Sequence, residues 1–204
     1  MLNISLNEIY SEAYKAFRSI GIEWGLAKDA ANQSKWLAEH GFYFLGSILK
    51  NADLYKKGEL SLLIKENTLE KPLSAALMGL LLVEYVSSAN LKWKGYIYDY
   101  KFLCAAMGII GNEQNVQLIL KKNKKIIACT LGKKMYVQKD MVNKTEHFSL
   151  EPYLSNQEFD LNKLQKIEKL PVPKVNKKCW DRLKLMAFET YVPESETSKS
   201  GAGY

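Results

Sequence analysis

The chain has 204 residues, of which 47% are hydrophobic and 25% are charged, values typical of a globular protein and not of a collagenous, disordered or membrane-dominated chain. This length suits one domain or two small domains. The net charge is +7, and nearly all of the basic residues are lysines, because Arg18 and Arg182 are the only arginines. A protein that binds specific nucleic-acid sequences is expected to use arginine for bidentate contacts.

Two amphipathic helices are predicted at the start of the chain. Ser5 and Glu8 form a capping-box pattern, and apolar residues then recur at helical spacing as far as Ile20. A second helix is predicted over residues 24–40, with small side chains on its apolar face that allow a neighbouring helix to approach closely. The two helices are therefore predicted to form an antiparallel hairpin.

Short helices are predicted over residues 42–67, and a third long helix from Pro72 to about Ser88. This third helix is apolar on nearly all sides, which indicates a buried position. Strands are predicted after Asn90, where residues 96–100 alternate with a period of two. Short separators between the later strands predict an antiparallel meander; those strands cover residues 116–121, 126–131 and 135–138.

Residues 140–175 are predicted to be a polar connecting segment with one short helix over 161–169, and a last helix follows, ending before Pro193. Helices followed by strands predict the α+β class. The expected architecture is an N-terminal helical hairpin and buried helix, an antiparallel β-meander and a C-terminal helix. We predict a single domain over 1–204, composed of a helical half (1–90), antiparallel strands (91–140), a connecting segment (141–175), and a helix and tail (176–204).

Neither a metal site nor a cofactor is predicted. The two histidines, His40 and His147, have no metal-ligand spacing, and the three cysteines are scattered without a Cys-x-x-Cys pair. Cys104 and Cys129 are predicted to be inert packing residues inside strands. The longest apolar run, residues 73–83, is too short to span a bilayer, and no secretory signal is visible, so we predict a cytoplasmic protein without a membrane partner.

Glu84 is the single charge in the apolar third helix. If it is buried, its carboxyl would have a raised pKa and could act as a general acid or base; the alternative is a carboxylate near the helix end that reaches solvent or pairs with a lysine. The tyrosine row at 96, 98 and 100 resembles a stacking platform for single-stranded nucleic acid, but core packing is the favoured interpretation. Trp36, at the edge of the polar face of its helix, suggests a partner surface if exposed.

The C-terminal tail supplies a second candidate site. Its carboxylates and hydroxyls could bind a ligand, with Trp24 as an aromatic wall; the alternative is a tail that only caps the fold or docks on a second subunit. The candidate ligand-binding residues are Trp24, Glu84, Glu194, Ser195, Glu196, Thr197 and Ser198.

Short motifs at both ends resemble an uncharacterised bacterial family, a domain of unknown function. The motifs are residues 5–8 (Ser-Leu-Asn-Glu), 24–27 (Trp-Gly-Leu-Ala) with 36–37, 191–198, and the Gly-Ala-Gly of 201–203. The resemblance implies a soluble bacterial protein and supplies no activity.

Three functions are compatible with the sequence. The favoured hypothesis is a non-catalytic or accessory protein that binds a small anionic metabolite or a protein partner, with homo-oligomer formation left open. The alternative is a metal-independent enzyme acting on a small anionic metabolite, with lysines holding the anion and Glu84 or the tail carboxylates as acid–base groups. A weak nucleic-acid binder is the least favoured.

Overall fold

A computed structural model of the protein describes residues 1–64, 69–138, 144–153 and 163–190. The described part has the predicted α+β class, with N-terminal helices, a mixed sheet and a C-terminal helix. The helices are α1 (Leu6–Ser19), α2 (Trp24–Glu39), α3 (Leu45–Lys56), α4 (Ala75–Ser88), α5 (Tyr100–Gln114) and α6 (Lys177–Phe188). The strands are β1 (Leu2–Asn3), β2 (Leu73–Ser74), β3 (Trp93–Tyr98), β4 (Leu118–Lys122), β5 (Lys125–Leu131), β6 (Lys134–Val137), β7 (Thr145–Pro152), β8 (Gln165–Lys166) and β9 (Lys174–Val175).

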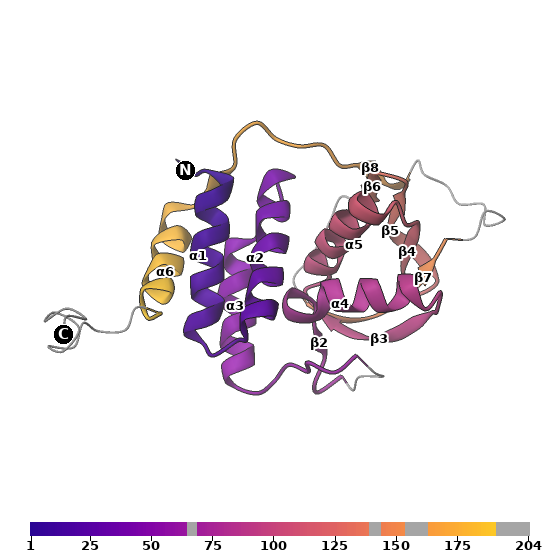
Figure 1. Ribbon diagram of the computed structural model, residues 1–204, viewed down its shortest axis with the longest axis horizontal. Coiled ribbons are helices and arrows are strands. Elements are labelled where there is room, and N and C mark those ends of the chain that lie inside the picture. The colour runs from indigo at the N-terminus through magenta and orange to yellow at the C-terminus, as the bar shows by residue number, and fades with distance from the viewer. Residues whose placement is uncertain (65–68, 139–143, 154–162, 191–204) are drawn as a thin grey trace, which may run out of the picture.

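The first two helices form the predicted hairpin (Figure 1). The Ser5 hydroxyl oxygen accepts a hydrogen bond from the Glu8 amide at 3.1 Å, so α1 begins where the capping pattern predicts. Both helices bury small side chains, which lets them pack closely; these are Ala13, Ala16, Ala27, Ala30 and Ala31. Helix α6 packs against α1 on the side away from the sheet, and β1 pairs with β9 near the start of α1.

The apolar helix α4 begins three residues later than predicted. Leu73 and Ser74 pair in parallel with β3, and the Ser74 hydroxyl then accepts a hydrogen bond from the Leu77 amide at 3.4 Å to cap the helix. Most of α4 is buried, as expected. One face is not, because Leu81 and Tyr85 are 39% and 47% exposed.

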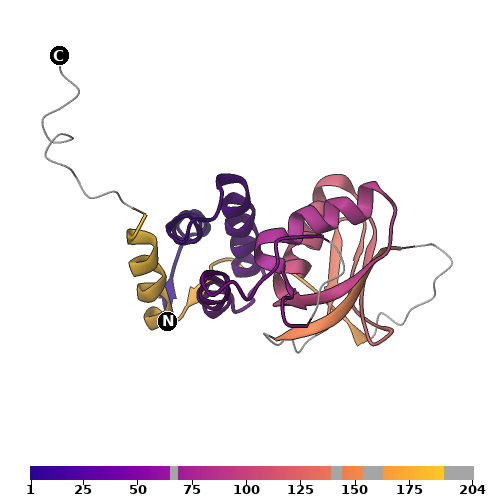
Figure 2. The same ribbon diagram turned by 90° about the horizontal axis from the view of Figure 1, so that it is seen from below.

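Seven of the described strands form one large sheet in the order β2-β3-β7-β4-β5-β6-β8, and β1 and β9 form a separate pair. The meander β4–β5–β6 is confirmed, with antiparallel pairing between neighbours. Strand β7 lies between β3 and β4, although its residues are predicted to belong to a connecting segment. Helices α4 and α5 cover one face of this sheet (Figure 2), and their buried apolar side chains join those of the N-terminal helices in one continuous cluster.

Helix α5 replaces the strand that the sequence predicts around Cys104. The chain leaves β3 at Asp99, whose backbone is left-handed (φ 55°), and the helix starts at Tyr100. Residues 102–107 are buried on every side, so their apolar side chains carry no helical period that could have revealed α5. As a consequence, Tyr98 and Tyr100 belong to different elements, and both are buried.

The short helix predicted over 161–169 is wrong for residues 164–169. Residues 165 and 166 form the edge strand β8 against β6, and residues 167–173, which we call the strap, then run without helix to β9 (Figure 1). The Ile167 amide donates to the Met135 carbonyl at 3.0 Å, and the Leu170 amide donates to the Glu39 carbonyl at 2.7 Å. The strap therefore joins the sheet to the end of α2.

Candidate functional site

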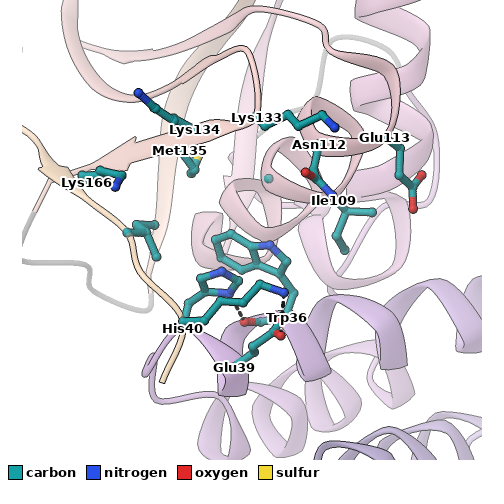
Figure 3. A pocket seen from close by; sticks show the side chains of 13 residues that line it. Trp36, Glu39, His40, Ile109, Asn112, Glu113, Lys133, Lys134, Met135 and Lys166 are labelled. Atoms are coloured by element: carbon teal, nitrogen blue, oxygen red, sulfur yellow. Dashed lines mark hydrogen bonds and ion pairs between the residues drawn. The ribbon is translucent and has the colours of Figure 1, made fainter. Parts of the chain in front are cut away.

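A cleft of about 300 Å³ opens where α2, α5 and β6 meet (Figure 3). Its walls come from the last turn of α2, the second half of α5, and the turn between β5 and β6. The remaining wall is formed by Lys166, Ile167 and Lys169 of β8 and the strap. The site is thus assembled from segments that are far apart in the sequence.

Trp36 and His40 form an aromatic wall of this cleft. Their ring centroids are 4.0 Å apart with an angle of 28° between planes, and Phe42 extends the stack with its centroid 6.1 Å from that of Trp36. Trp36 can lie against α5 because residue 108 is glycine. A Cβ atom added at Gly108 would be 2.4 Å from Trp36 Cζ2. The outcome is a half-buried indole beside the cleft, suited to stacking on a planar group.

The backbone fixes the tautomer of His40. Its Nδ1 lies 2.8 Å from the Trp36 carbonyl oxygen, which only accepts hydrogen bonds, so Nδ1 carries the hydrogen and donates. Burial lowers the pKa of His40 below its usual 6.5; the hydrogen bond to Trp36 and the charge of Glu39 act in the opposite direction, and Lys169 lowers the pKa further. At neutral pH the ring is therefore uncharged, and Nε2 is left as an acceptor or a base.

The charged lining of the cleft has an excess of lysine. It comprises Lys133, Lys134, Lys166, Lys169, Glu39 and Glu113. Lys169 Nζ is held by Glu39 Oε1 at 2.7 Å, and Lys166 Nζ lies 3.2 Å from Glu168 Oε1. Among the described residues, Lys133 and Lys134 have no ion-pair partner. These two ammonium groups make one side of the cleft attractive to an anion.

A second polar cluster is buried where α3 meets the start of α5. Lys101 Nζ donates to Ser47 Oγ at 2.9 Å and to the Tyr43 carbonyl at 3.0 Å, and lies 3.8 Å from Asp99 Oδ1. Burial raises the pKa of Asp99, while Lys101 and the Ser47 hydroxyl act to lower it. Burial likewise lowers the pKa of Lys101, and Asp99 counteracts that shift.

The pairing of Ser47 with Lys101 has the composition of a nucleophile and its base. However, Ser47 is fully buried and Lys101 is only 4% exposed, so a substrate has no access to the hydroxyl in this structure. We therefore assign the cluster a structural role, which is to join α3 to the junction between β3 and α5.

The structure places Trp24 on the surface, at the start of α2 and 71% exposed. Its ring packs at a tilt against Tyr14, with centroids 6.4 Å apart, and the Arg18 guanidinium carbon lies 4.7 Å from its centroid. Trp24 is not among the residues that line the cleft.

Glu84 is exposed, which corrects the hypothesis of a buried acid–base group. It lies near the end of α4 and close enough to Asp29 for its charge to raise the pKa of Asp29, in addition to the larger effect of burial. This is the solvent-reaching alternative that the sequence left open, and it removes the basis for general acid–base catalysis by this residue.

The tail residues Glu194, Ser195, Glu196, Thr197 and Ser198 lie outside the described residues. Helix α6 precedes the tail, and the last described residue after it is Thr190. The Thr190 hydroxyl donates to the Lys15 carbonyl of α1 at 2.7 Å.

Two residues of the cleft stand out in the sequence separately. Trp36 suggests a partner surface if exposed, and His40 is predicted at the end of the second helix; their spacing of four residues places both on one helix face. Lys133 and Lys134 are visible in the sequence only as part of a turn. Their position beside α2 depends on β6 and on the strap, and both of these segments are far from α2 in the sequence.

Within the described ranges, no helix is long and apolar enough to cross a membrane. In the same ranges, no three His, Cys, Asp or Glu side chains are grouped so that they could hold a metal ion. Burial raises the pKa of Cys104, with Asp99 adding to the shift, and raises that of Cys129 to about 12, so neither thiol ionises near neutral pH.

Comparison with known protein families finds a similarity over the first part of the chain. Residues 4–59 match the family described as "Protein of unknown function (DUF3726)", which confirms a resemblance to an uncharacterised family over α1, α2 and α3. The match covers less than half of the chain and includes Trp36 and His40 of the cleft. No curated protein and no solved structure matches the chain.

Proposed function

We propose that this protein binds a small anionic metabolite with a planar part in the cleft between α2, α5 and β6. The observation that carries the proposal is that one cleft is lined both by the Trp36–His40 stack and by Lys133 and Lys134, which have no ion-pair partner among the described residues. A planar group would stack on the indole, and a carboxylate, sulfonate or phosphate would face the ammonium groups. A neutral His40 and the exposed Asn112 amide would supply the remaining hydrogen bonds.

The volume of the cleft limits the size of the ligand. About 300 Å³ lies at the lower end of the range for small-molecule sites, so the ligand would be no larger than one or two fused rings with an acidic group. The strap, fixed at both the sheet and α2, defines one wall and gives the site a set shape.

Naphthalene-1-sulfonate is a suitable probe, because it carries one flat ring system and one permanent negative charge. We expect it to bind, as measured by isothermal titration calorimetry. The double variant Lys133→Gln/Lys134→Gln should bind it about tenfold more weakly, since it loses two charge-assisted contacts at a partly exposed site. Trp36→Leu should weaken binding about threefold to tenfold through the loss of stacking.

The matched control is Lys50→Gln/Lys57→Gln, which removes the same charge from exposed positions on and after α3. This variant should bind the probe as the unmodified protein does. Methanesulfonate and uncharged 1-naphthol separate the two parts of the ligand, and both should bind more weakly than the complete probe. Equal losses in the control and cleft variants would show that only net charge attracts the anion, and would refute the site.

A second candidate function, catalysis on the same ligand, is favoured by His40 alone. With Nδ1–H fixed on the backbone, Nε2 is a positioned base that could take a proton from a bound substrate. In this enzyme alternative the lysines would hold the anionic group. His40, and not Glu84, would be the acid–base group.

The pH dependence of probe binding tests whether His40 faces the bound anion. An anion next to His40 stabilises its protonated form, so the affinity for naphthalene-1-sulfonate should rise as pH falls below 6.5 through the lowered pKa of His40. The affinity should be constant between pH 7 and pH 8, where the ring is uncharged. His40→Gln should remove this pH dependence; an unchanged profile in this variant would assign the titration to another group.

A further inference from the structure

The face of the sheet turned away from α4 has a separate basic hollow of about 380 Å³. It is lined by residues of β3, β4 and β7 and of the hairpin turn between β4 and β5; its basic groups are Lys92, Lys94, Lys121, Lys124 and His147. The strand register explains why they converge. Lys94 pairs across with Ser149 of β7, and Ser149 pairs with Lys121 of β4, so three strands contribute to one row.

Two of these lysines share one carboxylate. Lys92 and Lys121 both form ion pairs with Glu151, which is 8% exposed. Burial alone would raise the pKa of Glu151, but its hydrogen bonds to Lys121 and Lys92 outweigh burial and hold the pKa below its usual value. Among the described residues, Lys94 and Lys124 have no such partner. The hollow therefore keeps an excess of positive charge, since its four lysines face one carboxylate and two of them have no such partner among the described residues.

The backbone conformation at Lys124 disfavours a residue with a side chain. The turn at Asn123 and Lys124 has two residues between paired strands, and both have positive φ, 49° and 65°. This is the type I′ hairpin turn, for which Asn followed by Gly is the preferred sequence. Asn123 fits the preference, whereas Lys124 adopts a left-handed conformation that a side chain destabilises. The turn thus places an ammonium at the lip of the hollow at a cost in hairpin stability.

We propose that this hollow is a second binding site, specific for a compact oligophosphate group. Several closely spaced negative charges match several lysines within one small concavity better than a single charge does. The Asn123 amide and the Ser149 hydroxyl add neutral hydrogen-bond donors to the lining. The group can be a free oligophosphate or the triphosphate end of a nucleotide, since both present the same chemistry.

A nucleic-acid strand fits this face less well. Stacking of successive bases needs a row of open aromatic rings, but Tyr98 and Tyr100 are buried. The ring of the half-buried Tyr96 makes a T-shaped contact with that of His147, with ring centroids 5.2 Å apart. One exposed imidazole remains, which suits a single compact ligand and not a chain of bases.

Calorimetric titration of the full chain with inorganic tripolyphosphate tests the proposal. Lys94→Gln and Lys124→Gly should each weaken tripolyphosphate binding about tenfold, whereas the control Lys50→Gln/Lys57→Gln should change it less than twofold. Lys124→Gly should also raise the thermal unfolding midpoint, because glycine suits the turn. Loss of affinity together with higher stability would support a site that is maintained at the expense of the fold.

Other outcomes would overturn the proposal. Equal weakening in the control variant would show a general charge effect, and loss of binding in Trp36→Leu would place the anion in the other cleft. A nucleoside triphosphate should compete with tripolyphosphate at similar affinity. Single-stranded RNA without a terminal phosphate should not compete; competition that strengthens with RNA length would replace the oligophosphate by a nucleic-acid strand.

Discussion

Replacing Lys101 by alanine should lower the free energy of unfolding by about 3–5 kcal/mol, the largest effect that we expect from one substitution in this protein. The ammonium is almost completely buried, and the substitution leaves the Asp99 carboxylate without the cation that faces it. The Tyr43 carbonyl and the Ser47 hydroxyl also lose their shared donor. Urea denaturation at pH 7, followed by circular dichroism, measures this loss.

A double-mutant cycle separates the ion pair from simple packing. Lys101→Met keeps most of the side-chain volume, and Asp99→Asn keeps a residue that tolerates the left-handed backbone at φ 55°. Each single variant should be strongly destabilised, because it buries one uncompensated charge. The double variant should regain much of the loss, since both desolvation penalties disappear together. Additive losses would show that Asp99 and Lys101 do not interact.

The effect of pH identifies the group that is left uncompensated. Burial already raises the pKa of Asp99 above its usual 3.8, and removal of Lys101 removes an interaction that opposes this rise. A raised pKa in the folded state means that the stability gained from protonation is complete below pH 3.8 and is lost as pH rises through the folded value. The deficit of Lys101→Met should therefore shrink as pH falls from 7 towards 4. A constant deficit would exclude Asp99 as the cause.

The helical hairpin and the meander could be predicted from the sequence because each has a local signal. Ser5 and Glu8 mark the start of α1, and short polar separators mark the turns of β4, β5 and β6. Helix α5 and strand β7 could not be predicted in the same way. The first part of α5, residues 100–107, is buried on all sides and so lacks a period. Strand β7 is stabilised by pairing with β3 and β4, of which neither is adjacent to it in sequence.

The candidate site shows the same limit. Trp36 and His40 share a helix face, so their proximity could be predicted from the sequence. Their neighbours Lys133 and Lys134 come from the turn between β5 and β6 and from the first residue of β6. The strap that forms a wall of the cleft begins in a segment expected to contain a helix. Glu84 is a choice that the sequence left open. A single charge in an apolar helix could be a buried acid or a carboxylate that reaches solvent, and Glu84 lies on the face of α4 that the fold leaves exposed.

Gly108→Ala should abolish most of the binding to the α2–α5–β6 cleft while leaving the protein folded. The added methyl group would lie 2.4–3.0 Å from three atoms of the Trp36 ring, which is rigid, so the ring must move away from α5. The cost of the clash, about 1–3 kcal/mol, is partly offset by the gain of about 1 kcal/mol from alanine in a helix interior. The net change in stability is therefore small. The stack on His40 is lost, and affinity for naphthalene-1-sulfonate should fall more than tenfold.

Two variants show whether Trp36 is the cause. Gly25→Ala changes a helical glycine of α2 whose added methyl would meet no atom within 4 Å, so it should leave probe binding unchanged. Gly108→Ala/Trp36→Leu removes the large ring from the clash and should recover stability relative to Gly108→Ala without recovering binding. If Gly108→Ala bound the probe as tightly as the unmodified protein, the indole would not form the wall against which the ligand stacks, and the proposed site would have to be abandoned.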